Sequence, residues 1–347
     1  MRLYTKQHKH YCGIDLHTNK MYLCILSQEG DILLHRNIKT EPETFLKTIA
    51  PYRDDLVVCA ECMFSWYWLA DLCATENIPF ILGHALYMRA IHGGKSKNDK
   101  IDSQKIAALL RGGLIPMAYV YPQRMRATRD LMRRRNHLMR KRAELFAHTQ
   151  NTASQYNLQV PLGRIAKPQN REGLLDRFDD PSVCMSMAAN LDMIDAYDRV
   201  LAVLEQDIIA HAKEHDPTAY ALLKSIPGVG RINALNLLYE IEDISRFPRV
   251  QDFASYCRLV TCSKESNGKK YGSGGKKIGN AHLRWAFSLA AQLFLKSNEP
   301  GRQFHDKLVR KHGKGKALSI LAHKLGRAVY FMLKNRQGFN MHTFLAV

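Results

Sequence analysis

Four carboxylates occupy positions from which they could act together on one metal site. Asp15 follows the apolar start of GIDLHTNK, Glu61 ends the run VVCAE, and Asp99 and Asp102 lie three residues apart in KNDKID. Residues three apart share one face of a helix. Two Mg²⁺ ions about 4 Å apart can stabilise the attacking and leaving oxygens of a phosphodiester, and they prefer hard oxygen ligands. The four acids therefore predict metal-dependent cleavage of phosphodiesters.

Each of these acids also has an ordinary structural explanation. Asp15 could be a turn acid, Glu61 a surface charge, and Asp99 or Asp102 the N-cap of a helix. The metal-site interpretation depends on all four lying where strand ends and a helix converge. The elements that carry them therefore decide between the two explanations.

The N-terminal third predicts an α/β domain. Alternating apolar and polar residues over 11–35 indicate three short strands. Thr40 is expected to cap a helix that ends near Ala50. A buried strand, a helix, a strand and a last helix should follow, at LVVCAE (56–61), SWYWLADLCATEN, IPFILG (78–83) and 101–111. This is the element order of an RNase H-like fold, which other α/β domains share in part.

A very basic helical segment comes next. Residues 124–142, which include Arg133 and Arg134, contain a single acid, Asp130. Leucines recur every seven residues at 131, 138 and 145, and a second helix over 186–215 has apolar residues three and four apart. The two helices predict either an antiparallel hairpin within the chain or a coiled coil between subunits. The link over 158–182, which contains prolines, should be irregular.

From about Pro217 the pattern predicts an all-helical domain with glycine-rich interruptions. Helices are expected at 231–243, 250–257, 281–297, 301–311 and 316–335. SIPGVGRINALNLLYEI (225–241) has the form of a helix-hairpin-helix motif. In such a motif Gly228 and Gly230 would open a helix whose free N–H groups bind a DNA phosphate. A plain glycine turn between two helices is the alternative.

The segment 253–286 is rich in Gly, Ser and Lys. It predicts an exposed loop that contacts phosphates. Candidate phosphate contacts, each of which could equally be a solvated surface charge, are Lys269, Lys270, Lys276, Lys277 and Arg284.

The composition favours a polyanionic partner. Lys and Arg number 51 against 32 Asp and Glu, so the formal net charge is +19. Such an excess attracts nucleic acid through counterion release, and a basic but otherwise ordinary enzyme is the alternative. No apolar run reaches the roughly 18 residues of a membrane span. The N-terminus lacks the apolar core of a secretory signal, so a cytoplasmic protein is expected.

The acidic motifs resemble those of the DEDD-type insertion-sequence transposases, the IS-one-ten family, which are relatives of the Piv DNA invertases. The matching order is GIDLHTNK, AECMFSWYWLA and KSKNDKIDSQKIA. The family shows Gly-hydrophobic-Asp, then Glu before a small-residue turn and an aromatic, then Lys-x-Asp-x-x-Asp. The resemblance implies a domain similar to the Holliday-junction nuclease RuvC. It also implies two Mg²⁺ ions, with Mn²⁺ as the alternative, on the tetrad Asp15, Glu61, Asp99 and Asp102.

The C-terminal segment resembles the same family's transposase domain. The family shows a tyrosine and Gly-Leu, a Pro, a Ser-Gly pair, and a basic run that ends in Lys-x-Gly-Asn and Leu-Arg. Its serine is the nucleophile that becomes covalently linked to DNA. Counts forward from Leu259 and back from Gly279-Asn280 both give Ser266 as the matching serine.

This chain departs from the family pattern at three places. Arg258 replaces the usual glycine, Thr261 the usual proline, and Asn267 the glycine after the serine. These departures leave the geometry of the loop open. Ser273, in YGSGG, is therefore an alternative nucleophile.

The sequence thus predicts an RNase H-like domain over 1–115, a basic helical or coiled-coil segment over 116–215, and a helical transposase domain over 216–347. The resemblance implies a recombinase that joins target and donor DNA, guided by a bridge RNA, as a dimer or tetramer at the prokaryotic nucleoid. Two other classes stay open. A junction-resolving nuclease would use the same acids with water as nucleophile, and a non-catalytic relative would only bind nucleic acid.

Overall fold

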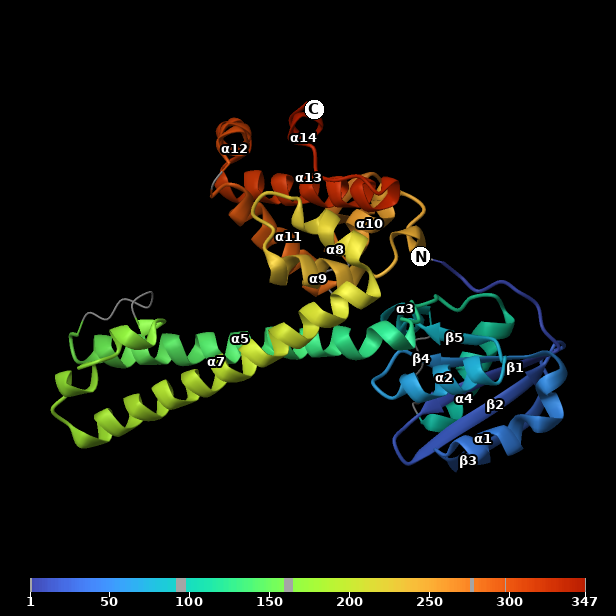
Figure 1. Cartoon of the computed structure of the whole chain (residues 1–347). Helices are drawn as coiled ribbons and strands as arrows, with labels where there is room; N and C mark the ends of the chain where they lie inside the picture. The colour runs from blue at the N-terminus through green and yellow to red at the C-terminus, as the bar shows by residue number, and fades with distance from the viewer. Residues whose placement is uncertain (1, 92–97, 159–164, 275–277, 297, 347) are drawn as a thin grey trace. The chain divides into compact units, whose positions relative to one another are not determined.

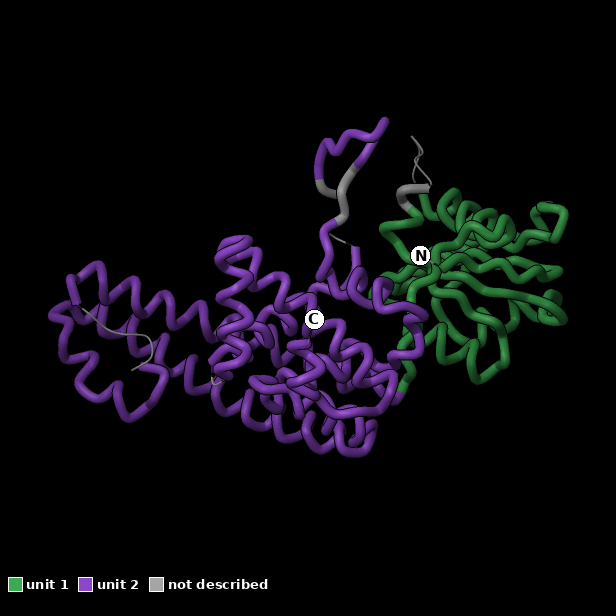
Figure 2. The backbone as a smooth tube through the Cα atoms, turned by 90° about the horizontal axis from the view of Figure 1, so that it is seen from above, with its two compact units in different colours: residues 1–123 green, residues 124–347 purple. Residues whose placement is uncertain are grey.

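The computed structural model describes residues 2–91, 98–158, 165–274, 278–296 and 298–346 (Figure 1). The chain divides into two compact units, unit 1 over residues 1–123 and unit 2 over residues 124–347 (Figure 2). In this partition the long basic helix belongs to the same unit as the C-terminal helices. The three-domain division expected from the sequence stays a prediction. No helix in the described ranges is long and apolar enough to cross a membrane.

Unit 1 is built on a five-stranded sheet with the strand order β3-β2-β1-β4-β5. β1 (His10–Leu16), β2 (Lys20–Ser27) and β3 (Ile32–Lys39) are antiparallel neighbours. β4 (Leu56–Glu61) returns parallel to β1, and β5 (Phe80–Gly83) runs parallel to β4. The predicted mixed α/β sheet is confirmed, because these strands occur in the expected order.

Helices cover both faces of this sheet. Since successive strand residues point to opposite faces, Ile14 and Leu23 join Phe45 in the core under α1 (Pro42–Ile49) and α2 (Trp66–Thr75). Tyr11 and Val57 point the other way, into the core under α4 (Asp99–Arg111). A short 3₁₀ helix, η1 (Ala50–Asp55), leads into β4.

Two details of unit 1 differ from the prediction. Thr40 does not cap α1, which begins at Pro42; its Oγ1 donates instead to the carbonyl of His17 (3.0 Å). A further helix, α3 (Ala85–Ile91), follows β5 directly. Seven residues are too few to show a helical period in the sequence, so this helix was missed.

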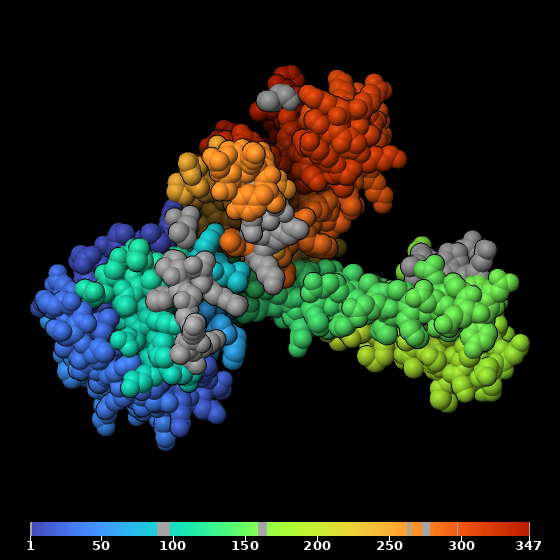
Figure 3. Space-filling model, turned by 180° about the vertical axis from the view of Figure 1, so that it is seen from behind, coloured from blue at the N-terminus to red at the C-terminus, as the bar shows by residue number. Residues whose placement is uncertain are grey.

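In unit 2, α5 (Gln123–Gln155) and α7 (Pro181–His215) lie side by side (Figures 1 and 3). Ion pairs join Arg135 to Glu205 (2.6 Å) and Arg142 to Asp198 (2.7 Å). Because the residue number rises along α5 as it falls along α7, the two helices are antiparallel. Of the two predicted alternatives, the structure of the single chain is therefore the helical hairpin. The link contains only short 3₁₀ turns among its described residues, η2 (Pro168–Asn170) and η3 (Leu175–Arg177).

The remaining helices of unit 2 share one core, in which Phe253, Phe287 and Leu325 are buried together with Met132 of α5. They are α8 (Pro217–Lys224), α9 (Arg231–Ile241), α10 (Val250–Tyr256), α11 (Ala281–Phe294), α12 (Glu299–His312), α13 (Lys314–Asn335) and α14 (Met341–Leu345), with the 3₁₀ turn η4 (Ile244–Arg246). The predicted helical C-terminal region is confirmed in this respect.

The expectation of an all-helical domain is wrong at one place. β6 (Cys262–Ser266) and β7 (Lys269–Gly274) form a hairpin where a loop was expected. Asn267 and Gly268 connect the strands, and both have positive φ, 49° and 72°. An Asn-Gly pair with positive φ at both positions is the favoured two-residue turn of a hairpin.

Candidate active site

Asp15 and Glu61 come from neighbouring strands at the same edge of the sheet. β1 and β4 are parallel, and Ile14 pairs with Ala60. The next residue on each strand is Asp15 and Glu61, respectively. Both are partly buried. The strand register therefore places these two acids next to each other, as the sequence predicts.

Gly13 allows α4 to approach β1 closely. A Cβ at this position would lie 2.3 Å from the backbone nitrogen of Ala107 and 2.4 Å from the carbonyl oxygen of Ser103, both in α4. Any side chain would therefore push the helix away from the strand. This contact carries the first turn of α4 toward the strand end that holds Asp15.

Asp99 and Asp102 lie in that first turn of α4. Neither is the N-cap, because the side chain of Asn98 accepts the hydrogen bond from the amide of Ile101 (2.8 Å). The ordinary explanation of these two acids as helix caps is therefore excluded. Asp102 also pairs with Lys105 (3.8 Å).

Asp15, Asp99 and His17 form the acidic cluster of unit 1. The Nε2 atom of His17 lies 3.4 Å from Oδ2 of Asp15 and 3.6 Å from Oδ1 of Asp99. One ligand atom from each of the three residues lies within 4.8 Å of the other two. His17 was not predicted as a site residue, although its position two residues after Asp15 puts it on the same side of the extended chain.

The electrostatics of the cluster favour a bound cation. Burial raises the pKa of Asp15 above its ordinary value; His17 lowers it, and the charges of Asp99 and Asp102 raise it again. Carboxylates that repel one another are stabilised by a divalent ion. Carboxylate oxygens suit hard divalent ions such as Mg²⁺ or Mn²⁺, whereas an imidazole is the more usual ligand of other transition metals. When bound, such an ion polarises phosphoryl oxygens and stabilises a leaving oxygen.

Ser266 occupies an accessible place in unit 2. It is the last residue of β6, opposite Lys269, and it is exposed. The Asn267-Gly268 turn follows it directly. The neighbouring strand residues Glu265 and Lys270 form an ion pair (3.6 Å). The hydroxyl thus lies beside the tip of a hairpin that carries basic residues.

Comparison with known proteins relates the N-terminal and the C-terminal parts of the chain to transposases. Residues 12–157 match the transposase family of DEDD type that is named for IS110. Residues 220–306 match the transposase IS116/IS110/IS902 family. The chain is a DEDD-type transposase of the IS110 family. It is therefore an enzyme of DNA strand cleavage and transfer.

Similar proteins of other insertion elements agree with this assignment. The transposase for insertion sequence element IS1111A of Coxiella burnetii is 21% identical over 339 residues, which cover 94% of this chain and 90% of the relative. The transposase for IS1328 of Yersinia enterocolitica is 23% identical over 334 residues, which cover 92% and 95%. An uncharacterised 43.6 kDa protein of insertion element IS110 from Streptomyces coelicolor is 27% identical over 176 residues, 47% of this chain and 42% of that protein. The family uses a divalent metal ion, for which the acidic cluster is the candidate site.

The other predicted site residues of the transposase are spread over unit 2. Lys269, Lys270 and Arg284 are exposed. Lys276 and Lys277 lie outside the described residues. Ser273 pairs with Ser263 in the hairpin, and its side chain is likewise not described. All of these assignments stay predictions.

Much of the predicted basic face of α5 is occupied by the chain's own acids. Arg133 binds Glu240 through Nε (2.6 Å) and Nη2 (3.0 Å), whereas Arg134 is exposed. Arg135 and Arg142 pair with acids of α7, as described above. The sequence showed the arginines but not these partners, because the partners are distant in the chain.

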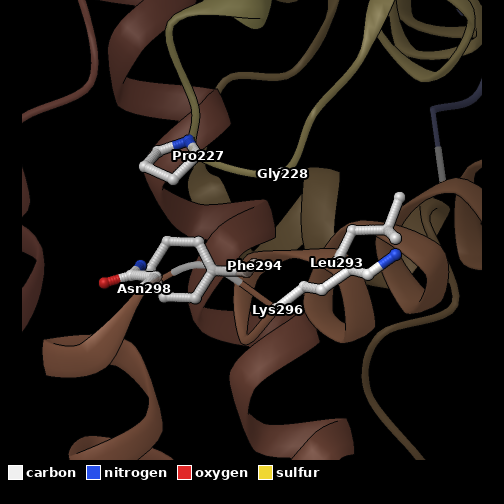
Figure 4. Close-up of a pocket in the computed structure, with 6 residues that line it drawn as sticks. All are labelled: Pro227, Gly228, Leu293, Phe294, Lys296 and Asn298. Carbon is white, nitrogen blue, oxygen red and sulfur yellow. The ribbon is translucent and has the colours of Figure 1, made fainter.

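The two glycines of the 225–241 motif differ in their surroundings. Gly228 has φ +80°, and a Cβ there would lie 2.5 Å from the backbone carbon of Leu293, so packing requires glycine. A Cβ at Gly230, which precedes α9, would meet nothing within 4 Å. A cavity of ≈ 200 Å³ adjoins the turn (Figure 4), lined by Pro227, Gly228, Leu293, Phe294, Lys296 and Asn298. A side chain could therefore be accommodated at Gly230 but not at Gly228.

Proposed function

We propose that this transposase cleaves and rejoins DNA through a covalent intermediate on Ser266, together with Mg²⁺ held by Asp15, Glu61, Asp99 and Asp102. The metal assignment is supported by the acidic cluster of Asp15, Asp99 and His17 and by the strand register of Glu61. The sheet order, with β4 returning parallel to β1, supports an RNase H-like, RuvC-like fold for unit 1.

The observation that best supports Ser266 is the backbone on either side of it. The family has glycine at two positions where this chain has Arg258 and Asn267, and both residues have left-handed φ, 55° and 49°. Glycine adopts this conformation without strain, and Asn is among the residues that tolerate it best. The backbone at both positions thus suits the family's glycines. This agreement supports the register in which Ser266 is the family's serine.

The proposed reaction exchanges one ester for another. Oγ of Ser266 forms a bond to the phosphorus of the scissile phosphodiester, and the bond from phosphorus to one deoxyribose oxygen breaks. The serine hydroxyl gives up its proton, and the leaving oxygen takes one up. Because the phosphodiester energy is kept in the serine ester, a second DNA hydroxyl can reverse the step with a new partner strand.

We infer that target DNA, donor DNA and a bridge RNA bind to the exposed basic residues, consistent with the net charge of +19. Lys269 and Lys270 flank the hairpin tip beside Ser266, and Arg134 and Arg284 are exposed on helices. Such contacts neutralise phosphates without reading sequence, so the RNA would supply the specificity.

We infer further that the transposase self-associates through the outer face of α7. Met193, Val200 and Val203 are 49%, 46% and 65% exposed, and Ala196 lies between them. Their spacing of three and four residues makes a continuous apolar stripe. Leu201, by contrast, is 4% exposed and packs within the chain. A second copy of α7 is the partner that such a stripe fits.

One experiment separates the proposal from its rivals. Labelled DNA of the insertion-element ends is incubated with the protein, guide RNA and Mg²⁺, and the products are run on a denaturing gel. The proposal expects a protein–DNA adduct that withstands denaturation. Cut DNA without an adduct indicates a junction-resolving nuclease with water as nucleophile. Intact DNA that is bound in a native gel indicates a non-catalytic relative.

A further inference from the structure

Glu240 is a buried acid that the proposed chemistry does not use. It lies in α9 and is 2% exposed. Its Oε2 accepts from Nε (3.3 Å) and Nη2 (3.2 Å) of Arg129, and Arg133 binds both of its oxygens (2.6 and 3.0 Å). Both arginines belong to α5. One carboxylate thus joins α9 to the long helix of the helical hairpin.

Asn280 connects the same carboxylate to the segment that carries Ser266. Its Nδ2 donates to Oε2 of Glu240 (2.7 Å) and, at a longer distance, to the hydroxyl of Tyr256 (3.3 Å). Its Oδ1 accepts from the amides of His282 (2.9 Å) and Leu283 (3.1 Å) and so caps α11. Asn280 is only 7% exposed. The two ends of this amide therefore have separate partners, the cap of α11 and the charge of Glu240.

The β6–β7 hairpin is closed at its base beside Asn280. The amide of Asn280 donates to the carbonyl of Tyr256 (2.6 Å), just before the hairpin segment begins. Nε of Arg258 donates to the carbonyls of Ile278 (2.9 Å) and Gly279 (3.0 Å), where the segment ends. Residues 256–258 before the hairpin and residues 278–280 after it are thus hydrogen-bonded to each other, next to the side chain that binds Glu240.

Stability alone is a weak reason for such a cluster. Burying an ion pair costs desolvation energy that packed apolar residues avoid, so buried pairs often stabilise little. Charged hydrogen bonds do, however, fix the relative orientation of the groups that they join. Burial by itself raises the pKa of Glu240, but Arg133, Arg129 and Asn280 outweigh it and hold the pKa at about 2. The carboxylate therefore stays charged and continues to orient its three partners.

We propose that Glu240 and Asn280 are positioning residues, which fix the direction in which the Ser266 hairpin leaves the helical core and couple that direction to α5. This inference rests on the proposed role of Ser266. A change in α5 would reach the serine through one carboxylate and one amide.

The test uses Asn280→Ser, which keeps an oxygen to cap α11 but loses the donor to Glu240. Asn233→Ser is the matched control, because Asn233 is another buried Asn, and its Nδ2 donates to the carbonyl of Ala286 (3.0 Å) rather than to Glu240. Amide hydrogen exchange at residues 256–260 and 278–283 reports on the hairpin base. Single-turnover adduct formation at saturating DNA reports on the chemistry, and DNA affinity is measured in parallel.

We expect Asn280→Ser to speed exchange at the hairpin base and to slow adduct formation by about tenfold or more, with DNA affinity within about twofold of wild type. Asn233→Ser should leave both rates near wild type at equal thermal stability. Glu240→Gln should slow adduct formation, and the double variant should be no slower than the worse single variant. If Asn280→Ser behaves like Asn233→Ser in exchange and rate, the positioning role is wrong. If wild type forms no adduct, the role of Ser266 fails, while the exchange data still test whether Asn280 and Glu240 hold the hairpin.

Discussion

Asp15 and Asp99 share one histidine, since Nε2 of His17 lies within 3.6 Å of a carboxylate oxygen of each. The two acids come from a strand end and from the first turn of a helix, so only the fold brings them together. His17 is a polar partner placed between these two carboxylates. A divalent metal ion in the same place would attract both carboxylates more strongly than the imidazole does. Substitutions in the acidic cluster should therefore affect the binding of a divalent metal ion most directly.

Asp15→Asn and Asp99→Asn should reduce strand cleavage by at least about 100-fold, because they remove metal ligands. DNA binding should change little, since it depends on the basic residues. In wild type, Mn²⁺ at about 100 times its Kd should stabilise unit 1 by about 2.7 kcal/mol, and both variants should lose this effect. Calorimetry with and without Mn²⁺ measures it, with Asp31→Asn as an exposed control. Wild-type cleavage by either variant contradicts the metal assignment.

Gly228→Ala should destabilise the fold much more than Gly230→Ala. A Cβ at Gly228 meets backbone atoms at 2.5 Å and φ there is +80°, so the alanine should cost at least about 2 kcal/mol of folding free energy. At Gly230 there is open space, so the cost should stay below about 1 kcal/mol. Thermal unfolding measures both. Equal losses of folding free energy in the two variants would contradict the conclusion that packing requires glycine at 228 but not at 230. If the N-terminus of α9 binds phosphate, Gly230→Ala should in addition weaken DNA binding.

Acid should remove the contribution of Glu240 within a defined window. Its ordinary pKa of 4.5 falls to about 2 in the folded protein, so its stabilising effect is full above the ordinary value and is lost as pH falls toward 2. Glu240→Gln should lower the free energy of unfolding by about 3 kcal/mol near pH 7, because the buried Arg129 and the partly buried Arg133 lose their counterion. The difference from wild type should shrink between about pH 4.5 and pH 2. A difference that is independent of pH over this range would show that the charge of Glu240 is not responsible.

The apolar stripe on α7 should mediate self-association. Val200→Asp with Val203→Asp should shift the protein to a smaller species in sedimentation velocity, while the helical signal in circular dichroism is kept. Ala202→Asp is the control, because Ala202 is exposed on the same turn but lies off the stripe. The buried Leu201 is a poor site for this test, since a charge there disrupts the chain's own packing. A mass unchanged by the valine substitutions would assign the stripe another role.

The sequence predicted best what depends on local pattern. Alternation identified the strand that carries Asp15, and a short apolar run identified the one that carries Glu61. The long helical periods identified α5 and α7. The hairpin at 262–274 was missed as structure because its strands are polar and rich in glycine and lysine. In retrospect, the Asn267-Gly268 pair was a signal for it.

Contacts between residues far apart in the chain could not be predicted from the sequence pattern. Arg129 and Glu240 are 111 residues apart, so nothing in the sequence shows that the arginine run supplies internal partners as well as surface charge. His17 was passed over for a related reason. A histidine after a strand has many ordinary roles, and only the position of α4 shows that it faces two acids.

The most direct test of the account is to identify the residue that becomes attached to DNA. The protein is incubated with guide RNA, Mg²⁺ and a DNA substrate that traps the intermediate, and the adduct is digested and sequenced by mass spectrometry. The account predicts a nucleotide on Ser266, loss of the adduct in Ser266→Ala, and its retention in Ser273→Ala. A nucleotide on Ser273, or strand exchange without any serine adduct, would contradict it.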